Sequence, residues 1–360
     1  MKNLILLWKI ILLRISEKLA TKWILPVSYT VSVTYRCNSQ CQTCNIYKKK
    51  SPELSPEEYG KIFKTIGGSA YWVTISGGEP FLRKDLFDIV YNIYKHSKPK
   101  VINIPTNGLL YKQIPSVVKK IATHCPRSTI VINISIDEIG KRDDRIRGVR
   151  NAYTNAVRTF NQLKKLNLKN VNIGIHTVIS KFNVDNFREI AGTLMDMDPD
   201  SYITEIAENR VELGTENIDI SPSYPKYSQA IDYLLFNIKN RPFKGMNKIT
   251  QALRIEYYTF VKKILREQKA LIKCYAGILT VQIASNGDVW PCCILAKEMG
   301  NLKNYNYNFK KLWFKNQALQ KERRRIRQEK CFCPMANASY TNMLMNNKIA
   351  FRVLLHLLKK

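Results

Sequence analysis

Six strand-like runs, each followed by a helical stretch, limit what this chain can fold into. From residue 29 to about residue 208, short runs rich in β-branched residues alternate with amphipathic stretches; the first run is YTVSVTY and the last is SYITEIA. This order predicts an α/β fold in which a parallel sheet, open or curled toward a barrel, has its helices on the outside. The functional loops of such a sheet leave the carboxyl ends of its strands.

The loops that carry reactive side chains all follow those strands. After the first strand, residues 36–47 read RCNSQCQTCNIY. SGGEP (76–80), TNG (106–108) and SIDE (135–138) follow the next three strands. Because the carboxyl ends of parallel strands meet at one edge of the sheet, we expect these four loops to converge on a single site.

Charge and cysteine content narrow the classes of function. The 360 residues include 58 Lys and Arg against 28 Asp and Glu, so the net charge is +30 and favours nucleic acid, anionic lipid or a phosphorylated substrate as partner. Nine cysteines lie mostly in clusters, and no export signal is recognisable. This predicts metal or cluster ligation in a reducing cytoplasm rather than a disulfide framework.

Both ends of the chain carry apolar stripes at helical spacing with basic residues beside them. One stripe lies in residues 1–28 and the other in residues 341–360. Their apolar runs are shorter than the roughly 20 residues that a membrane span needs. Two interpretations have equal weight: the helices pack on the protein's own body, or they lie peripherally on the inner face of the cytoplasmic membrane. The apolar positions are Leu4, Trp8, Ile11, Leu12, Ile15 and Leu19 at one end and Phe351, Leu354, Leu355 and Leu358 at the other.

The pattern changes after about residue 220, which predicts a division of the chain. Residues 29–220 form the expected barrel core. Residues 221–273 form a mostly helical connection that opens with the linker-like SPSYP, and residues 274–340 form a smaller cysteine-rich domain. Two strand runs in that domain flank Asn286 and Gly287, a pair typical of a hairpin turn.

The first cysteine cluster supplies three thiols, whereas a tetrahedral metal ion or a four-iron cluster takes four ligands. Cys37, Cys41 and Cys44 are separated by three and then two residues. Structural zinc sites usually bring cysteines in two C-x-x-C pairs. The isolated triplet fits three corners of a 4Fe–4S cluster better, and the fourth iron is then open to a ligand from outside the protein.

Together with GGEP after the second strand, this triplet resembles the radical S-adenosylmethionine (radical SAM) superfamily over residues 29 to about 208. The resemblance implies a TIM-like partial (β/α)6 barrel and a 4Fe–4S cluster on Cys37, Cys41 and Cys44. It implies that the fourth iron binds S-adenosyl-L-methionine, and that electrons from a reductant such as ferredoxin or flavodoxin cleave this cofactor to a 5′-deoxyadenosyl radical. Such a radical abstracts a hydrogen atom from an unactivated carbon.

The resemblance also assigns cofactor contacts to the strand-end loops. GGEP would meet the methionine ammonium, the next two loops the ribose or the methionine, and an arginine the carboxylate, which its planar fork suits. One position departs from the family pattern: Thr43 replaces the aromatic residue that covers the adenine, a role open to Ile46 or Tyr47. The implied cofactor-binding residues are Gly77, Gly78, Glu79, Pro80, Asn107, Ser135, Asp137 and Arg147.

The later cysteines resemble the auxiliary-cluster extensions called SPASM and, in shortened form, twitch. This segment has fewer cysteines than a full SPASM module, so the resemblance implies one auxiliary 4Fe–4S cluster on Cys274, Cys292, Cys331 and Cys333. The final pair is C-x-C where relatives usually have C-x-x-C, and Cys293 is a spare thiol that can replace a ligand. Zinc on the same thiols is the alternative.

Three further features are expected to be structural. Cys125 is predicted to be a buried thiol, and His176, at the end of the fifth strand, is either a satisfied structural group or a residue that faces the substrate. The basic run KERRRIRQEK is predicted to be a solvated helix face, with phosphate binding as its alternative.

We therefore predict a radical SAM enzyme whose auxiliary cluster takes up an electron from the product radical or positions the substrate. The basic, apolar-striped termini favour a lipid or lipid-linked glycan at a membrane surface as substrate. Alternatives are a peptide maturase, weakened because residues 1–28 are too short for a peptide-recognition domain, and a sugar-alcohol dehydrogenase. An RNA-binding iron–sulfur protein is the alternative from a different class, and DNA is not an expected partner.

Overall fold

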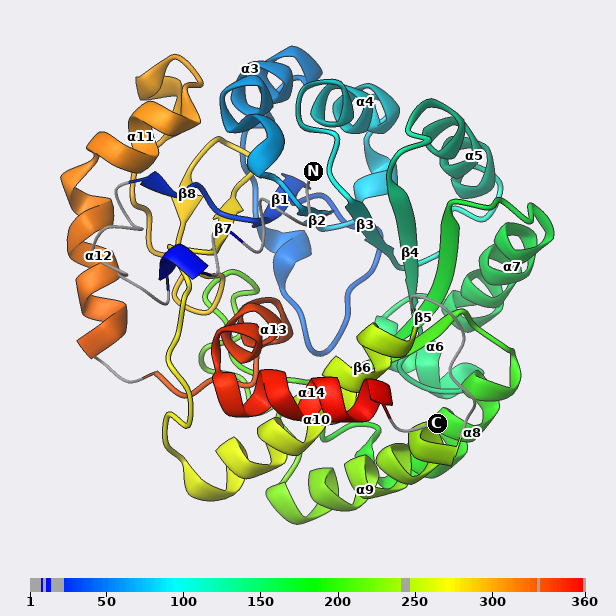
Figure 1. Cartoon of the computed structure of the whole chain (residues 1–360). Helices are drawn as coiled ribbons and strands as arrows, with labels where there is room; N and C mark the ends of the chain where they lie inside the picture. Colours follow the sequence, from blue (N-terminus) through cyan, green and yellow to red (C-terminus); the bar gives the residue numbers. More distant parts are fainter. Residues whose placement is uncertain (1–7, 9–10, 14–22, 241–246, 329–330, 359–360) are drawn as a thin grey trace.

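The computed structural model describes residues 8, 11–13, 23–240, 247–328 and 331–358, which contain an eight-stranded sheet in the order β6-β5-β4-β3-β2-β1-β7-β8 (Figure 1). Strands β1 to β6 pair in parallel in chain order, and within the described residues the sheet stays open. The predicted α/β fold with a partial parallel barrel is confirmed. The strands are Ser28–Thr34 (β1), Trp72–Gly77 (β2), Val101–Thr106 (β3), Thr129–Ser135 (β4), Val171–Ile179 (β5), Ser201–Ile206 (β6), Thr280–Ile283 (β7) and Val289–Trp290 (β8).

Helices surround the outer side of the sheet, as Figure 1 shows. Those between consecutive strands of the barrel are Pro56–Ile66 (α3), Leu86–Ser97 (α4), Ile114–His124 (α5), Lys141–Arg147 (α6), Ala152–Lys165 (α7) and Phe187–Asp196 (α8). Tyr224–Asn240 (α9) and Asn247–Glu267 (α10) occupy the segment for which the sequence predicts a helical connection. Phe309–Lys315 (α11), Gln317–Gln328 (α12), Ala336–Met345 (α13) and Asn347–Leu358 (α14) follow the last strand.

Side chains alternate along the barrel strands between an apolar outer face and a polar inner face. The outer face carries Ile75, Ile104 and Ile134, which are fully buried in the main core. The inner face, called the lumen below, carries Ser, Thr and Asn; for example, Asn133 Nδ2 donates to Asn103 Oδ1 at 2.9 Å. Barrel interiors are commonly filled by Val, Ile and Leu. A lumen lined with hydrogen-bonding groups is therefore suited to a polar ligand.

The C-terminal cysteine-rich segment shares its sheet with the barrel. The predicted hairpin around Asn286 and Gly287 is confirmed, because β7 and β8 pair in antiparallel fashion on either side of it. Strand β7 also pairs in parallel with β1, from Ser28 opposite Thr280 to Val31 opposite Ile283. The sequence analysis did not anticipate this second pairing, which places the auxiliary segment directly beside the strand that leads into the first cysteine loop.

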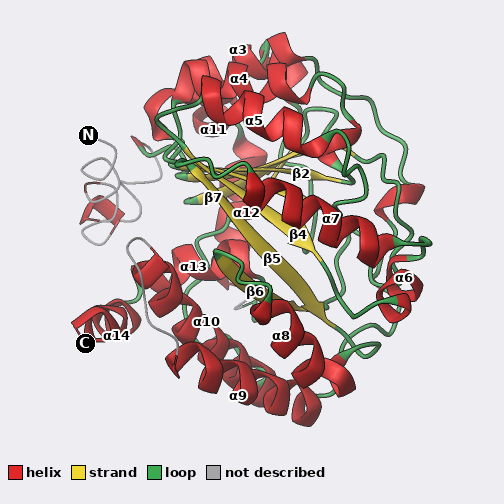
Figure 2. Cartoon of the chain, turned by 90° about the vertical axis from the view of Figure 1, so that its right-hand side faces the viewer, coloured by secondary structure: helices red, strands yellow, loops and turns green. Residues whose placement is uncertain are grey.

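The terminal helices have one face on the protein body and another in solvent. Leu13 is buried beside Met345, whereas Trp8 is 53% exposed. On α14, Val353 is buried and Phe351 is 60% exposed. The rest of the first stripe, apart from Ile11 and Leu12, lies outside the described residues, as do the side chains of Leu354 and Leu358. Helix α14 lies on the side of the molecule opposite α6 (Figure 2). Among the described residues, no helix has the length and apolarity to cross a membrane.

The basic helix α12 differs from its prediction as a solvated face. Arg323 is 2% exposed; its guanidinium lies over the Trp313 ring at 4.2 Å, and its Nε donates to the Gly277 carbonyl at 2.6 Å. Glu322 is also buried and pairs with Arg325. The helix therefore docks on the hairpin segment through its charged residues, since a guanidinium packs well on an aromatic face. The prediction for Cys125 is confirmed, because this thiol is fully buried in the main core.

Candidate active site

The loop that follows β1 holds Cys37, Cys41 and Cys44, and the carboxyl end of α6 closes on it. Gln40 N donates to the Arg147 carbonyl at 3.0 Å, and Gln42 N donates to the Ile146 carbonyl at 2.9 Å. Two backbone hydrogen bonds therefore fix the middle of the cysteine loop against a helix that follows β4. This contact brings the first and fourth predicted loops together.

Each thiol of this loop has an N–H donor beside it. Ser39 N donates to Cys37 Sγ at 3.4 Å, Ile46 N donates to Cys44 Sγ at 3.5 Å, and Arg147 Nη1 lies 3.7 Å from Cys41 Sγ. Cluster-bound thiolates accept such hydrogen bonds, so this donor set fits an iron–sulfur cluster. Burial raises the pKa of Cys37 to about 11 and that of Cys44 to about 12. Cluster binding must therefore release protons from both thiols.

Gly77, which ends β2, packs against the end of β1, and Gly78 packs against the start of the cysteine loop. A Cβ on Gly77, whose φ is +127°, would lie 2.0 Å from the Thr34 carbonyl oxygen. A Cβ on Gly78 would lie 2.2 Å from the Arg36 carbonyl oxygen. The resemblance places these glycines among the cofactor-binding residues. The structure shows close approach between two stretches of backbone, which only a residue without a Cβ permits.

Glu79 and Asn107 connect the loops after β2 and β3 to the cysteine loop. The buried Glu79 carboxylate accepts from Asn107 N at 2.7 Å and from Thr106 Oγ1 at 2.8 Å. Asn107 Nδ2 donates to Asn38 Oδ1 at 2.7 Å and lies 3.9 Å from Cys37 Sγ. Burial raises the pKa of Glu79 to about 7 against the effect of these donors. Pro80 begins the short 3-10 helix Pro80–Leu82 and is buried.

Arg147 is the charged centre of the fourth loop. Its Nη2 lies 3.1 Å from Asp137 Oδ2, and its buried Nε has no hydrogen-bond partner, with Asp143 Oδ1 at 3.9 Å. Asp137 is itself fixed by Val178 N, which donates to Oδ1 at 2.8 Å. Asp143 was not predicted from the sequence, although its position one helical turn before Arg147 is typical of an ion pair on a helix. Burial raises the pKa of Asp143 to about 7.

The remaining predicted positions lie on the lumen side. Ser135 ends β4 opposite His176 in the register of β5. Burial lowers the pKa of His176, and its Nε2 lies 4.0 Å from Glu205 Oε1. Ile46 is buried in a small apolar cluster that includes Cys37 and Cys44, and Tyr47 is half-buried.

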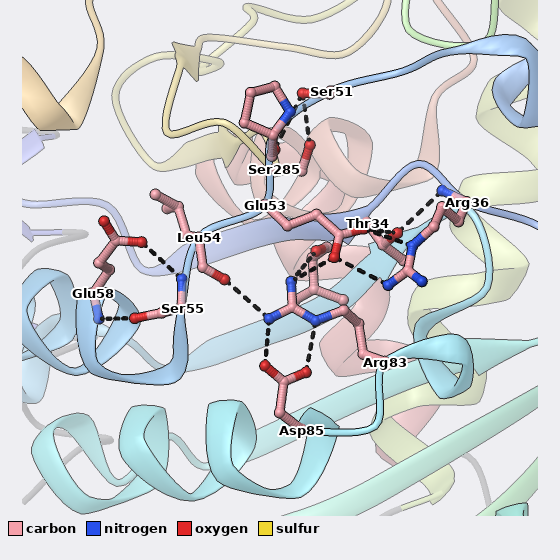
Figure 3. Close-up of polar contacts among 12 residues, drawn as sticks. Thr34, Arg36, Ser51, Glu53, Leu54, Ser55, Glu58, Arg83, Asp85 and Ser285 are labelled. Carbon is pink, nitrogen blue, oxygen red and sulfur yellow. Dashed lines mark hydrogen bonds and ion pairs between the residues drawn. The ribbon is translucent and has the colours of Figure 1, made fainter.

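A polar network on the outer side supports the start of the cysteine loop (Figure 3). Glu53 accepts from Thr34 Oγ1 and forms an ion pair with Arg36 at 2.9 Å. Arg83 is only 5% exposed; it contacts Glu53 at 3.2 Å, pairs with Asp85 at 2.6 Å and donates to the Leu54 carbonyl. None of these residues was singled out from the sequence, because no local motif marks a network assembled from three separate loops.

The later cysteines lie close enough to influence one another electrostatically. Cys274 and Cys292 each interact with Cys331 and Cys333, and Cys293 interacts with Cys292. Cys331 is exposed. Cys293 is buried and lies 2.9 Å from Met335 Sδ. The described residues contain no group of three or more His, Cys, Asp or Glu side chains placed to hold a single metal ion.

Two family models match this architecture. The model described as the radical SAM superfamily matches residues 31–194, and SPASM, described as an iron–sulfur cluster-binding domain, matches residues 274–334. The chain carries a radical SAM domain followed by a SPASM domain. Radical SAM enzymes with a SPASM domain use a 4Fe–4S cluster, S-adenosylmethionine and an auxiliary iron–sulfur cluster, and they need a reductant. The predicted enzyme class and cofactors are confirmed.

Individual relatives differ widely in what their names describe. The GTP 3′,8-cyclase of Clostridium botulinum is 27% identical over 289 residues, which are 76% of this chain and 83% of the cyclase. The subtilosin biosynthesis protein AlbA of Bacillus subtilis is 21% identical over 291 residues, which are 79% of this chain and 59% of AlbA.

Two solved radical SAM structures share the fold. Streptococcus suis SuiB bound to S-adenosylmethionine has a TM-score of 0.63 at 16% identity, covering 85% of this chain and 70% of SuiB. The structure named native anSMEcpe with bound AdoMet has a TM-score of 0.61 at 14% identity, covering 93% of this chain and 100% of that one.

Proposed function

We propose that Cys37, Cys41 and Cys44 hold the cluster that binds S-adenosylmethionine, and that Cys274, Cys292, Cys331 and Cys333 hold the auxiliary cluster. The observation that carries the first assignment is the convergence of four strand-end loops on three thiols, each beside an N–H donor. When bound, the cluster and S-adenosylmethionine supply a 5′-deoxyadenosyl radical that abstracts a hydrogen atom from the substrate.

The chain's own residues would then orient the cofactor. Asn107 holds the cysteine loop through Asn38 and lies beside Cys37. Arg147 lies between Cys41 and Asp137, and its guanidinium can pair with the cofactor carboxylate. Gly77, Gly78, Glu79, Pro80 and Ser135 complete the proposed cofactor edge, and Tyr47 is the proposed cover for the adenine.

The lumen supports a polar substrate. Its hydrogen-bonding side chains are joined near the carboxyl end of β6 by three carboxylates and a guanidinium, those of Glu205, Glu208, Glu212 and Arg210. A cleft of about 260 Å³ is lined by Glu208 of this region and by Pro334 of the auxiliary segment. An acidic lumen disfavours a triphosphate such as the GTP in the names of some relatives. We propose a peptide as the leading substrate, in line with the bacteriocin biosynthesis named for AlbA and with the structure of SuiB bound to precursor peptide SuiA.

A lipid or lipid-linked glycan is the second candidate, favoured by the exposed apolar side chains of the terminal helices. Trp8, Ile11, Phe351 and Leu355 are between 42% and 60% exposed on a chain of charge +30. Helix α14, however, lies on the side opposite α6, whose carboxyl end contacts the cysteine loop (Figure 2). A membrane held there would anchor the protein without facing its active site, so the lipid proposal is the weaker one.

Anaerobic reconstitution tests the ligand assignment. We expect about eight irons per chain, falling to about four in Cys37→Ala/Cys41→Ala/Cys44→Ala and to about four in Cys274→Ala/Cys331→Ala. Wild type with a chemical reductant should form 5′-deoxyadenosine, and the first variant should not. Unchanged iron in either variant would contradict the corresponding ligand set. Absence of 5′-deoxyadenosine from the wild type would contradict the catalytic assignment.

Substrate class can be tested by comparing two cell extracts. One extract comes from a deletion strain complemented with wild type, and the other from the same strain complemented with the triple-alanine variant. Their peptidomic and lipidomic profiles should differ from each other in a peptide. A difference confined to lipids or glycans would favour the second candidate. Flotation with phosphatidylglycerol vesicles, with and without Trp8→Ala/Phe351→Ala, tests the anchor separately.

A further inference from the structure

A short turn after β6 connects the two cysteine segments. This turn, Arg210–Thr215, is called the bridging turn below. Arg210 N donates to Thr215 Oγ1 at 3.0 Å, and Gly214 N donates to the Val211 carbonyl at 3.2 Å, so the turn is held by its own hydrogen bonds. Its conformation therefore does not depend on either cysteine segment alone.

One side of the bridging turn is fixed to the first cysteine loop. Asn45, the residue after Cys44, donates from its backbone N to the Leu213 carbonyl and from its Nδ2 to the Gly214 carbonyl, both at 2.9 Å. The Leu213 side chain belongs to the same small apolar cluster as Cys37 and Cys44. The turn is thus in contact with the proposed ligands of the first cluster.

The other side is fixed to the auxiliary segment. Val211 N donates to the Ile294 carbonyl at 3.0 Å, and Glu212 N donates to the Cys293 carbonyl at 3.3 Å. Cys293 directly follows Cys292, a proposed auxiliary ligand. Backbone bonds therefore hold residues 211 and 212 at a fixed place beside that ligand.

Two opposite charges are carried on this turn. Glu212 accepts from Ser32 Oγ at 3.2 Å and from Gln282 Nε2, both lumen residues. Arg210 has an exposed side-chain fraction of 16% and pairs with Glu208 at 3.0 Å and with Glu205 at 3.4 Å. Water and salt screen charges in such partly enclosed places much less than charges on the surface.

We propose that Glu212 and Arg210 set the reduction potential of the auxiliary cluster by their charges. The carboxylate favours the oxidised cluster and the guanidinium favours the reduced one, because local charge and hydrogen bonding control the potential of an iron–sulfur centre. The turn that carries both side chains donates to the Cys293 and Ile294 carbonyls, directly after the proposed ligand Cys292. The proposal rests on the auxiliary ligand set of the proposed function.

The test uses the full chain with Cys37→Ala/Cys41→Ala/Cys44→Ala, so that iron remains only on the auxiliary thiols. Potentiometric titration at pH 8, followed by electron paramagnetic resonance, gives the midpoint potential. We expect Glu212→Gln to raise it and Arg210→Gln to lower it. At a fixed solution potential, each substitution should change the ratio of reduced to oxidised cluster by roughly threefold or more. For a one-electron couple, a tenfold change in this ratio corresponds to a shift of about 59 mV in the midpoint potential.

Matched variants separate charge from packing. Glu212→Asp and Arg210→Lys keep the charges and should leave the midpoint close to that of the parent, as should Glu216→Gln, which removes an exposed carboxylate just past the turn. Equal potentials in all variants, or shifts of the same sign in both neutral ones, would overturn the proposal. So would loss of iron from Glu212→Gln with retention in Glu212→Asp, since the role would then be assembly. A parent without iron would instead contradict the ligand set.

Discussion

At the scale of the residue, the buried guanidinium of Arg147 contacts several charged or polar groups at once. It lies between the Cys41 thiol and two carboxylates, one of which is 2% exposed. Removing one partner of such a buried ion pair costs more than the pair contributes, since the remaining charge stays buried without compensation.

The expected result of Arg147→Gln is a loss of about 3–5 kcal/mol in the free energy of unfolding of the iron-free protein. The control is Arg145→Gln, an exposed arginine on the same helix, for which the loss should stay below about 0.5 kcal/mol. Urea unfolding followed by circular dichroism measures both. Similar losses in the two variants would show that Asp137 and Asp143 do not depend on Arg147.

The prediction for Gly78 rests on a steric clash and not on charge. The new Cβ of Gly78→Ala would lie 2.2 Å from the Arg36 carbonyl, one residue before Cys37, so the cysteine loop must shift. We expect about four of the eight irons to be lost on reconstitution, from the first cluster only. Gly68→Ala, which meets nothing within 4 Å, should retain all of them. Full iron in Gly78→Ala would mean that the loop accommodates the methyl group.

At the scale of the element, what holds the cysteine loop was only partly predictable. The repeated strand and helix runs predicted the order of β1 to β6, and the cysteine spacing predicted which loop would matter. Glu53 and the bridging turn were not predictable in this way. Glu53 acts across three loops, and the turn binds its neighbours through backbone groups that any sequence at positions 211–214 would supply. Neither leaves a pattern in its own stretch of chain.

The Glu53 network predicts a pH effect on stability. Burial alone would raise the pKa of Glu53, but hydrogen bonds from Arg36 and Thr34 and the charge of Arg83 outweigh it and hold the pKa below its ordinary value of 4.5. The ionised form is therefore favoured by folding. This stability is present above pH 4.5 and is lost as the pH falls through the lower folded value.

Wild-type protein should accordingly lose more unfolding free energy below pH 4.5 than Glu53→Gln does. Urea titrations of the iron-free proteins across this range measure the difference, with Glu216→Gln as the matched surface change. If Glu53→Gln and wild type show parallel pH profiles, the carboxylate does not stabilise the loop through its charge.

At the scale of the whole molecule, the barrel and the auxiliary segment form one structural unit. Strand β1 pairs with β2 on one side and with β7 on the other, and Trp313 of α11 donates to the Ile24 carbonyl just before β1 at 3.0 Å. The sequence indicated two domains because the composition changes after residue 220. It did not indicate that β1 and β7 pair, since the sequence of a four-residue strand does not show which strand it will pair with.

Because of this shared sheet, damage to the auxiliary segment should destabilise the barrel equally. Ile283→Ala in β7 removes a fully buried side chain and should cost about 2–5 kcal/mol. Its urea midpoint should fall by the same amount in far-ultraviolet circular dichroism, which reports mainly the helices around the barrel, and in tryptophan fluorescence, to which Trp290 and Trp313 contribute. Phe236→Ala, at a side chain that is 68% exposed on α9, should leave both midpoints unchanged. A fluorescence midpoint that falls alone would show two independently folding domains, and the hydrogen bonds between β1 and β7 would then not couple their unfolding.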